Sequence, residues 1–298
     1  MSEILLQAKQ ISKHFGGVTA LDKVDLTIKK GEIHCLMGEN GCGKSTLIKI
    51  ISGFYRPDGG RITFEGKEYE RLSIAESIGL GIQVIYQDMS IFPNLTVAEN
   101  IAINNELYNH RKLVNWKSVK SIAKEALDHI GIELPLQAVV GELSVADKQL
   151  IAIARAILNN SKLIIMDEPT SALTRKEVDK LFKVIRQLQK EGISTLFVSH
   201  KLDEVFEIAD QFTVFRNGKL VVADSAKNIN DEQFVYYMTG RKLEEAAFTP
   251  EKIDHDRAIL KVENLGLTNG FEKISFEIHP GEILGITGLL GSGRTELA

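Results

Sequence analysis

Residues 38–45 decide the fold, and they read Gly38-Glu39-Asn40-Gly41-Cys42-Gly43-Lys44-Ser45. Their spacing is GxxxxGK[ST], in which the glycines let the backbone curl so that successive N–H groups point at phosphate oxygens. The short apolar run at residues 32–37 predicts a buried strand before the loop, and residues 44–51 predict a helix after it. The positive end of that helix dipole would lie at the same place. The sequence therefore predicts a phosphate-binding loop between a strand and a helix.

The side chains of this loop have separable roles. Lys44 would neutralise the β- and γ-phosphates of a nucleotide, and Ser45 would be a ligand of Mg²⁺. We expect the nucleotide to be bound by Gly38, Glu39, Asn40, Gly41, Cys42, Gly43, Lys44, Ser45 and Thr46. The loop alone does not choose among kinases, GTPases, helicases and transport ATPases.

A second apolar run ends in two carboxylates. Residues 163–166 predict a buried strand, and Asp167 and Glu168 follow it directly. At the end of a strand, Asp167 could bind Mg²⁺ or its water. Glu168 could polarise an attacking water, as hydrolysis of a γ-phosphate requires.

Composition and charge exclude several classes of protein. The 298 residues carry 36 Lys and Arg against 40 Asp and Glu, a net charge of −4, so nothing favours a protein that coats nucleic acid. Two cysteines make a disulfide-stapled fold or a zinc site of two CxxC pairs improbable. The start resembles no signal peptide, and no apolar stretch is long enough to span a bilayer. We expect a cytosolic chain that reaches a membrane only through another subunit.

The remaining patterns predict an α/β protein. Residues 195–198 predict another buried strand, and residues 115–130 and 177–191 have the apolar spacing of amphipathic helices. Asn217-Gly218, between short apolar runs at residues 212–215 and 220–222, predicts a hairpin.

An internal repeat predicts the domain organisation. Gly31, Glu32 and Ile33 recur 250 positions later, and the same offset places Gly288, Gly291 and Gly293 on the loop glycines. The charged residues 241–258, which include Pro250, predict a linker. We therefore expect one complete domain at residues 1–240 and, at 259–298, the truncated start of a homologous second domain.

The order of the motifs resembles an ATP-binding cassette (ABC) domain over about residues 5–240. It comprises the phosphate loop, Gln87, LSVADKQ (143–149), LIIMDEP (163–169), SALT (171–174) and His200. The resemblance implies a P-loop NTPase (RecA-like) core with an antiparallel β subdomain and an α-helical signature subdomain. It also implies ATP and Mg²⁺ as cofactors.

The resemblance further implies site residues. Phe15 would stack on adenine, and Ser144 would begin the signature helix and contact, in trans, the γ-phosphate bound by the opposite cassette. The catalytic set would be Lys44, Gln87, Glu168 and His200, with His200 sensing the γ-phosphate. The ligands of Mg²⁺ would be Ser45, Gln87 and Asp167, and Gln87 would link the core to the helical subdomain.

The signature segment and the second copy of the repeat indicate one subfamily of ABC domains. Val145, Ala146 and Asp147 replace the GGQ of the commoner LSGGQ, and this segment together with SALT resembles the importers of ribose, galactose and xylose. In that subfamily two cassettes are fused in one chain. In the second copy, Arg294 and Thr295 stand where the first has Lys44 and Ser45, so a second nucleotide site would behave differently.

The leading hypothesis is an importer ATPase, peripheral on the cytoplasmic face of the membrane. Its partners would be transmembrane permease subunits, a second ABC domain and, indirectly, a solute-binding protein, but no nucleic acid. The segment around Phe92 would contact the permease. Nucleosides or a signalling furanose are alternative substrates. A ribosome-associated twin cassette is the runner-up, although that class needs a long helical linker, and a DNA-repair cassette would need more cysteines.

Overall fold

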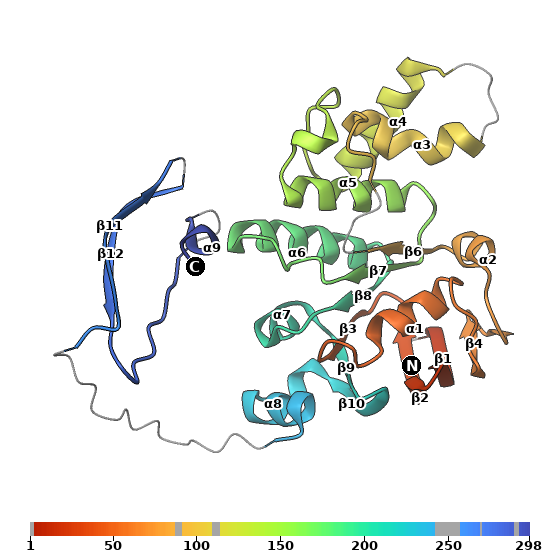
Figure 1. The fold of residues 1–298 in the computed structure, drawn as a ribbon. Helices are drawn as coiled ribbons and strands as arrows, with labels where there is room; N and C mark the ends of the chain where they lie inside the picture. The colour runs from red at the N-terminus through yellow and green to blue at the C-terminus, as the bar shows by residue number, and fades with distance from the viewer. Residues whose placement is uncertain (1–2, 87–90, 109–113, 242–256, 269, 289–291) are drawn as a thin grey trace. The chain divides into compact units, whose positions relative to one another are not determined.

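The computed structural model describes residues 3–86, 91–108, 114–241, 257–268, 270–288 and 292–298 (Figure 1). The chain divides into two compact units, Met1–Leu243 and Glu244–Ala298. No helix among the described residues is both long and apolar enough to cross a membrane.

A six-stranded sheet forms the centre of the first unit. Its strands are β3 (Ile33–Gly38), β6 (Ile82–Ile85), β7 (Leu163–Asp167), β8 (Ser194–Val198), β9 (Gln211–Arg216) and β10 (Lys219–Ser225). Their order is β10-β9-β3-β8-β7-β6, and all neighbours are parallel except β9 and β10. The predicted strands are confirmed. So is the hairpin, because Asn217 and Gly218 both have the positive φ that a tight two-residue turn requires.

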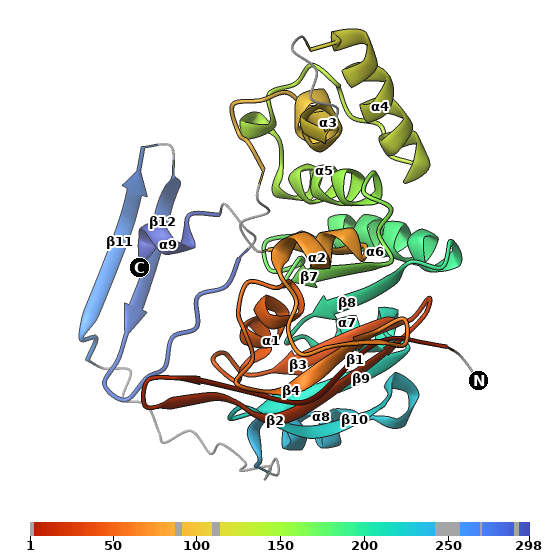
Figure 2. The same cartoon turned by 90° about the vertical axis from the view of Figure 1, so that its right-hand side faces the viewer.

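A smaller antiparallel sheet packs on one face of the central sheet. It comprises β1 (Ile4–Phe15), β2 (Val18–Lys29), β4 (Gly59–Phe64) and β5 (Lys67–Tyr69), in the order β2-β1-β4-β5 (Figure 2). The helix α1 (Lys44–Ile51) has the predicted bounds and contributes Leu47, Ile48 and Ile51 to the core shared by the two sheets. Because both faces of the central strands are covered, β3 is buried along its whole length.

Six of the helices that the structure describes contribute to a second hydrophobic core, distinct from the core shared by the two sheets. They are α3 (Val97–Tyr108), α4 (Trp116–His129), α5 (Val145–Ile157), α6 (Arg175–Lys190), α7 (Leu202–Ile208) and α8 (Asp231–Thr239), with short turns at η1 (Val140–Glu142) and η2 (Ala226–Asn228). The short α2 (Ile74–Gly79) precedes β6. Figure 1 shows α3, α4 and α5 grouped beyond α6. The unit thus has a mixed α/β core, an antiparallel β part and a helical part, as expected.

The helix α5 is buried more completely than its sequence predicts. Periodicity assigns it one apolar face through Leu150, Ile153 and Ala154, and these residues are buried. Ile151 and Ala152 are buried as well, because α5 contacts α3, α4, α6 and β6. Tertiary packing on several sides decides which residues of this helix are covered.

The second unit contains a hairpin of β11 (Leu260–Leu267) and β12 (Phe271–Ile278), and the short α9 (Arg294–Leu297). Lys273 has a left-handed φ of 54°, close to the 50° of Lys23, which lies 250 positions earlier. Residues 283–288, which the repeat aligns with β3, form no strand, and Ile283 is 82% exposed where Ile33 is fully buried. In the first unit β3 pairs with β8 and β9, and the described residues of the second unit supply no such neighbours.

Candidate functional site

The candidate site is the edge of the central sheet where three adjacent parallel strands end. Gly38 is the last residue of β3 and Asp167 the last of β7, with the end of β8 between them. The sequence that follows each strand carries the predicted chemistry: the phosphate loop after β3, Glu168 after β7 and His200 after β8. In open α/β sheets this carboxyl edge is the usual place for a ligand.

Two loop glycines are required by space as well as by conformation. Gly38 has φ 146°, and a Cβ there would lie 2.3 Å from the carbonyl oxygen of Phe215. Gly43 has φ 106°, and its Cβ would lie 2.5 Å from the carbonyl oxygen of Ala20. Any larger residue at either position would have to displace backbone. The loop conformation is therefore fixed by the neighbouring strands β9 and β2.

Lys44 is the first residue of α1, and it is only 6% exposed. Its ammonium donates hydrogen bonds to the carbonyl oxygens of Gly38, at 2.7 Å, and Glu39, at 3.0 Å. These bonds hold a buried cation inside the curl of the loop. A phosphate group bound there would meet that cation and the N-terminus of α1 together.

The other loop residues differ in exposure. Glu39, Asn40, Gly41 and Ser45 are exposed, Thr46 is half-buried and Cys42 is buried. Burial raises the pKa of the Cys42 thiol, against the opposing effect of the nearby Lys44 charge. Cys42 is therefore a neutral packing residue, and its carbonyl oxygen accepts a hydrogen bond from the Gly218 amide at 3.1 Å.

Two oxygen groups from different elements meet beside the loop. The hydroxyl of Ser45 donates to a carboxylate oxygen of Asp167 at 3.2 Å. Burial raises the pKa of Asp167, the charge of Glu168 adds to this shift, and the Ser45 bond opposes it. A divalent cation would stabilise the ionised form of the Asp167 carboxylate. Hydroxyl and carboxylate oxygens are ligands that suit Mg²⁺.

The residues present fit Mg²⁺ better than a metal held by protein groups alone. Among the described residues no three His, Cys, Asp or Glu side chains cluster closely enough to hold an ion. Mg²⁺ is usually held by one or two protein groups together with substrate phosphates and water, and Ser45 and Asp167 provide this arrangement.

Glu168 and His200 are brought together across the ends of β7 and β8. The Glu168 carboxylate lies 3.6 Å from Nδ1 of His200, and the side chains are 21% and 50% exposed. Glu168 has φ 49°, a strained conformation for a residue other than glycine. Its carbonyl oxygen accepts a hydrogen bond from the Ser171 hydroxyl at 3.1 Å, which helps to hold the turn.

The three other predicted residues lie elsewhere or are not described. Phe15 ends β1, is 41% exposed and packs edge-on against Tyr55, with ring centroids 5.1 Å apart. Ser144 is an exposed N-cap of α5, and its hydroxyl accepts the Asp147 amide at 3.1 Å. Gln87 lies outside the described residues.

The buried Glu204, which none of the sequence motifs includes, supports the segment around His200. Its carboxylate accepts a hydrogen bond from the Ser199 hydroxyl and pairs with the ammonium of Lys201 at 3.1 Å. Lys201 also donates to the carbonyl oxygen of Thr170, two residues after Glu168, at 3.2 Å. An acidic residue in the first turn of α7 was the available signal.

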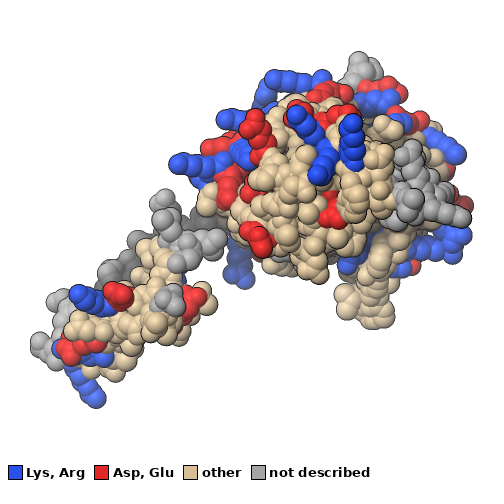
Figure 3. Space-filling model, turned by 90° about the horizontal axis from the view of Figure 1, so that it is seen from above, with Lys and Arg blue, Asp and Glu red and all other residues tan. Residues whose placement is uncertain are grey.

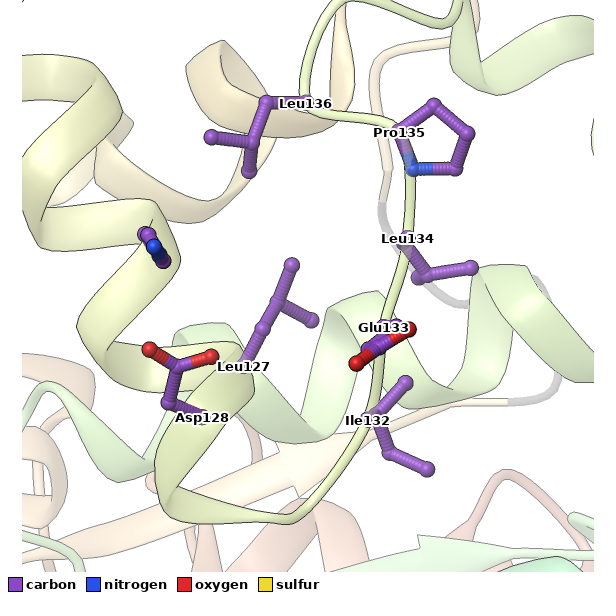
Figure 4. Close-up of a pocket in the computed structure, with 8 residues that line it drawn as sticks. Leu127, Asp128, Ile132, Glu133, Leu134, Pro135 and Leu136 are labelled. Carbon is purple, nitrogen blue, oxygen red and sulfur yellow. The ribbon is translucent and has the colours of Figure 1, made fainter.

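A pocket in the helical part is separate from these residues. It is formed by α4 and the extended segment after it, and Figure 4 shows its lining: Lys124, Leu127, Asp128, Ile132, Glu133, Leu134, Pro135 and Leu136. None of the predicted site residues belongs to it. On the face of the molecule in Figure 3, basic and acidic side chains are interspersed rather than gathered by sign.

Comparisons with known proteins show what this chain is similar to. The profile of a family described as "ABC transporter" matches residues 21–171. A putative ribose/galactose/methyl galactoside import ATP-binding protein of Halalkalibacterium halodurans is 45% identical over 98% of this chain and 56% of its own length. A ribose import ATP-binding protein of Caldanaerobacter subterraneus is 42% identical over 99% of this chain and 60% of its own length.

Solved structures agree with the fold. An ATP-binding cassette of an ABC transporter in its ADP conformation superposes with a TM-score of 0.71, at 29% identity, covering 79% of this chain and 98% of that one. A dimeric cassette bound to ADP and Pi superposes with a TM-score of 0.65, at 25% identity, covering 76% of this chain and all of that one. The chain spans 56–60% of the length of the two curated relatives named above.

Proposed function

The chain belongs to the ABC transporter family, and we propose that it binds ATP with Mg²⁺ at the edge of its central sheet and hydrolyses the γ-phosphate. The observation that carries this proposal is the convergence of the loop, the Ser45–Asp167 pair and the Glu168–His200 pair at the ends of three adjacent strands. Each of these groups has a separate task in phosphoryl transfer.

The geometry suggests how the tasks are divided. Lys44 and the loop N–H groups bind the phosphates, while Ser45 and Asp167, together with Gln87 by family resemblance, would hold the cation. Bound Mg²⁺ would offset the charge that develops on the phosphate oxygens. Glu168 accepts a proton from the attacking water, whose oxygen forms the new bond to phosphorus as ADP leaves. His200, beside that carboxylate, contacts the γ-phosphate.

The wider role we propose is the ATPase of a simple-sugar importer, peripheral on the cytoplasmic face of the membrane. The importer names of the relatives and the LSVADKQ and SALT segments support it. Transmembrane permease subunits would be direct partners, and a solute-binding protein would act through them. Nucleosides and signalling furanoses remain alternative substrates within the same mechanism.

We further propose that residues 259–298 begin a second cassette after a linker at 241–258. The hairpin β11–β12 and the shared left-handed φ of Lys23 and Lys273 support this. Arg294, which replaces Lys44, keeps the charge but not the compact ammonium, so the second site would bind nucleotide differently.

Release of inorganic phosphate from Mg·ATP tests the proposed activity. Replacing Glu168 with Gln keeps the size and hydrogen bonding of the side chain but removes the charge that accepts the proton. We expect Glu168→Gln to retain ATP binding and to release phosphate roughly 100-fold more slowly. A variant as active as the parent chain would assign the proton acceptor to another residue, with His200 the first to examine.

A further inference from the structure

The connection between α1 and β4 contains a carboxylate with an unusually dense set of contacts. Asp58 accepts a hydrogen bond from the Lys13 ammonium at 2.8 Å and another from the His14 amide at 2.6 Å. The Nδ1 atom of His14 lies 3.2 Å from the same carboxylate, and the Asp58 amide donates to the carbonyl oxygen of Ser12 at 2.8 Å. Asp58 thus forms hydrogen bonds with three consecutive residues of β1.

The next residue along β1 is Phe15, whose aromatic ring would stack on adenine according to the family resemblance. The Lys13 ammonium, held by Asp58, lies over this ring at 5.4 Å from its centroid. Tyr55, from the same connection as Asp58, packs edge-on against the ring. The connection between α1 and β4 therefore braces Phe15 twice, once through Lys13 and once directly.

The turn beyond Phe15 offers little support of its own. A Cβ atom at Gly16 or Gly17 would meet nothing within 4 Å, so this turn is open to solvent on that side. Phe15 itself remains 41% exposed. The backbone of Phe15 pairs with Val18 of β2. Its ring is contacted by Lys13, which Asp58 holds, and by Tyr55.

The carboxylate of Asp58 stays ionised over the physiological range of pH. The Lys13 ammonium, and after it the His14 amide, lower the pKa of Asp58 to about 2. Its carboxylate is therefore ionised wherever the protein functions. Lys13 is the less exposed partner, at 15% of its side chain against 38% for Asp58.

We propose that Asp58 is a positioning residue for the nucleotide base, holding the Phe15 ring in place for stacking through Lys13 and His14. This inference rests on the proposed function, because it needs ATP as the ligand. Stacking of a base on an aromatic ring changes affinity by roughly 5- to 100-fold. Loss of Asp58 should forfeit part of that gain while leaving the phosphate contacts intact.

Titration of the whole chain with two ligands, each with Mg²⁺, separates the base from the phosphates. The ligands are ATP and inorganic tripolyphosphate, which has no base. We expect Asp58→Ala to weaken ATP binding by about 5-fold and tripolyphosphate binding by less than about 2-fold. Phe15→Ala should show the same selectivity, and the double variant should be no weaker than Phe15→Ala alone, because the two residues act as one unit.

Asp25 provides a matched control. Its carboxylate braces the same pair of strands by accepting the Gln10 amide at 2.7 Å, and its hydrogen bonds go to Gln10 rather than to Lys13 or His14. We expect Asp25→Ala to bind ATP like the parent chain. If Asp58→Ala does not fold, Asp58→Asn, which keeps one acceptor oxygen, should still lower ATP affinity by about 2-fold without affecting tripolyphosphate.

The outcomes are distinguishable. Equal losses for both ligands would show that Asp58 only supports the fold, and unchanged ATP affinity in the Asp58 variants would show that Phe15 needs no such brace. Either result overturns the inference while leaving the proposed function standing. A parent chain that binds neither ligand would overturn the proposed function, and the role of Asp58 with it.

Discussion

The hydroxyl of Ser45, in the first turn of α1, donates a hydrogen bond to the carboxylate of Asp167, at the end of β7, over 3.2 Å. The two residues are 122 positions apart in sequence. This bond joins the phosphate loop to the strand that carries the two carboxylates, and it defines where a divalent cation would be held.

Asp167 should make the metal-free chain less stable at neutral pH. Burial raises its pKa in the folded state above the ordinary value of 3.8. The folded state therefore binds this proton more tightly than the unfolded state does. The resulting contribution to the free energy of unfolding is fully present below pH 3.8 and is lost as the pH rises through the raised pKa. At pH 7 with a chelator, we expect Asp167→Asn to raise the melting temperature by about 2 °C.

The higher melting temperature expected for Asp167→Asn should approach that of the parent chain as the pH falls toward about 4. Mg·ATP should stabilise the parent chain more than this variant. Asp179→Asn, which removes an exposed carboxylate paired with Arg175, provides the control and should show neither effect. Thermal melts at several pH values, with and without Mg·ATP, measure both the pH dependence and the stabilisation by ligand. A lower melting temperature for Asp167→Asn at pH 7 would contradict the assigned cost of burial.

Phe92 should couple ATP hydrolysis to transport. Its ring is 48% exposed, while its backbone is held by the buried Asn100, which accepts the Phe92 amide at 2.8 Å and donates to the Phe92 carbonyl at 2.9 Å. A charged side chain there would leave these backbone hydrogen bonds intact and would disrupt the apolar contact that we propose between Phe92 and the permease. We expect Phe92→Glu to abolish sugar uptake by the assembled transporter while nucleotide binding is preserved.

Phe206 on α7 is 44% exposed and provides the matched control, because Phe206→Glu adds the same charge at another surface position. Uptake assays in vesicles compare the two variants. Normal uptake with Phe92→Glu would remove this segment as the permease contact, and equal losses in both variants would indicate a general effect of the added charge.

Hydrolysis by the purified chain should depend on its concentration. The 298 residues contain one phosphate loop of the GK[ST] type and one LSVADKQ segment, and the family resemblance requires these two from different cassettes. Ser144 is exposed at the start of α5 and available to another copy. We expect slow turnover whose rate per molecule rises with protein concentration. Fast turnover that is constant down to nanomolar protein would show a self-sufficient site.

The sequence predicts those parts of the molecule whose causes are local. The helix α1 begins at Lys44 as predicted, because glycine conformation and apolar spacing act within a few residues. The burial of Ile151 and the absence of a strand at residues 283–288 depend on neighbours distant in sequence, which neither the apolar spacing of α5 nor the 250-residue repeat indicates. Asp58 was missed for the same reason, because its partner Lys13 is 45 positions away.

Within the site, motif spacing predicted the residues at the sheet edge but not their supports. Asp167 and Glu168 follow a recognisable strand, whereas the role of Glu204 becomes visible only when the fold brings Lys201 to the carbonyl of Thr170. The assignment of Gln87 stays a prediction, because it lies outside the described residues.

Equilibrium titration of the Lys44→Ala variant with fluorescent ATP and Mg²⁺ tests the phosphate-loop assignment most directly. Lys44 is the buried cation of the loop, and Lys30, which pairs at the surface with Glu3 and Glu65, provides the control for loss of a charge. Truncating a buried, hydrogen-bonded charge at a binding site typically costs about 30-fold or more in affinity. We expect Lys44→Ala to show no detectable ATP binding while Lys30→Ala binds like the parent chain; unchanged affinity in Lys44→Ala would contradict the phosphate-loop assignment.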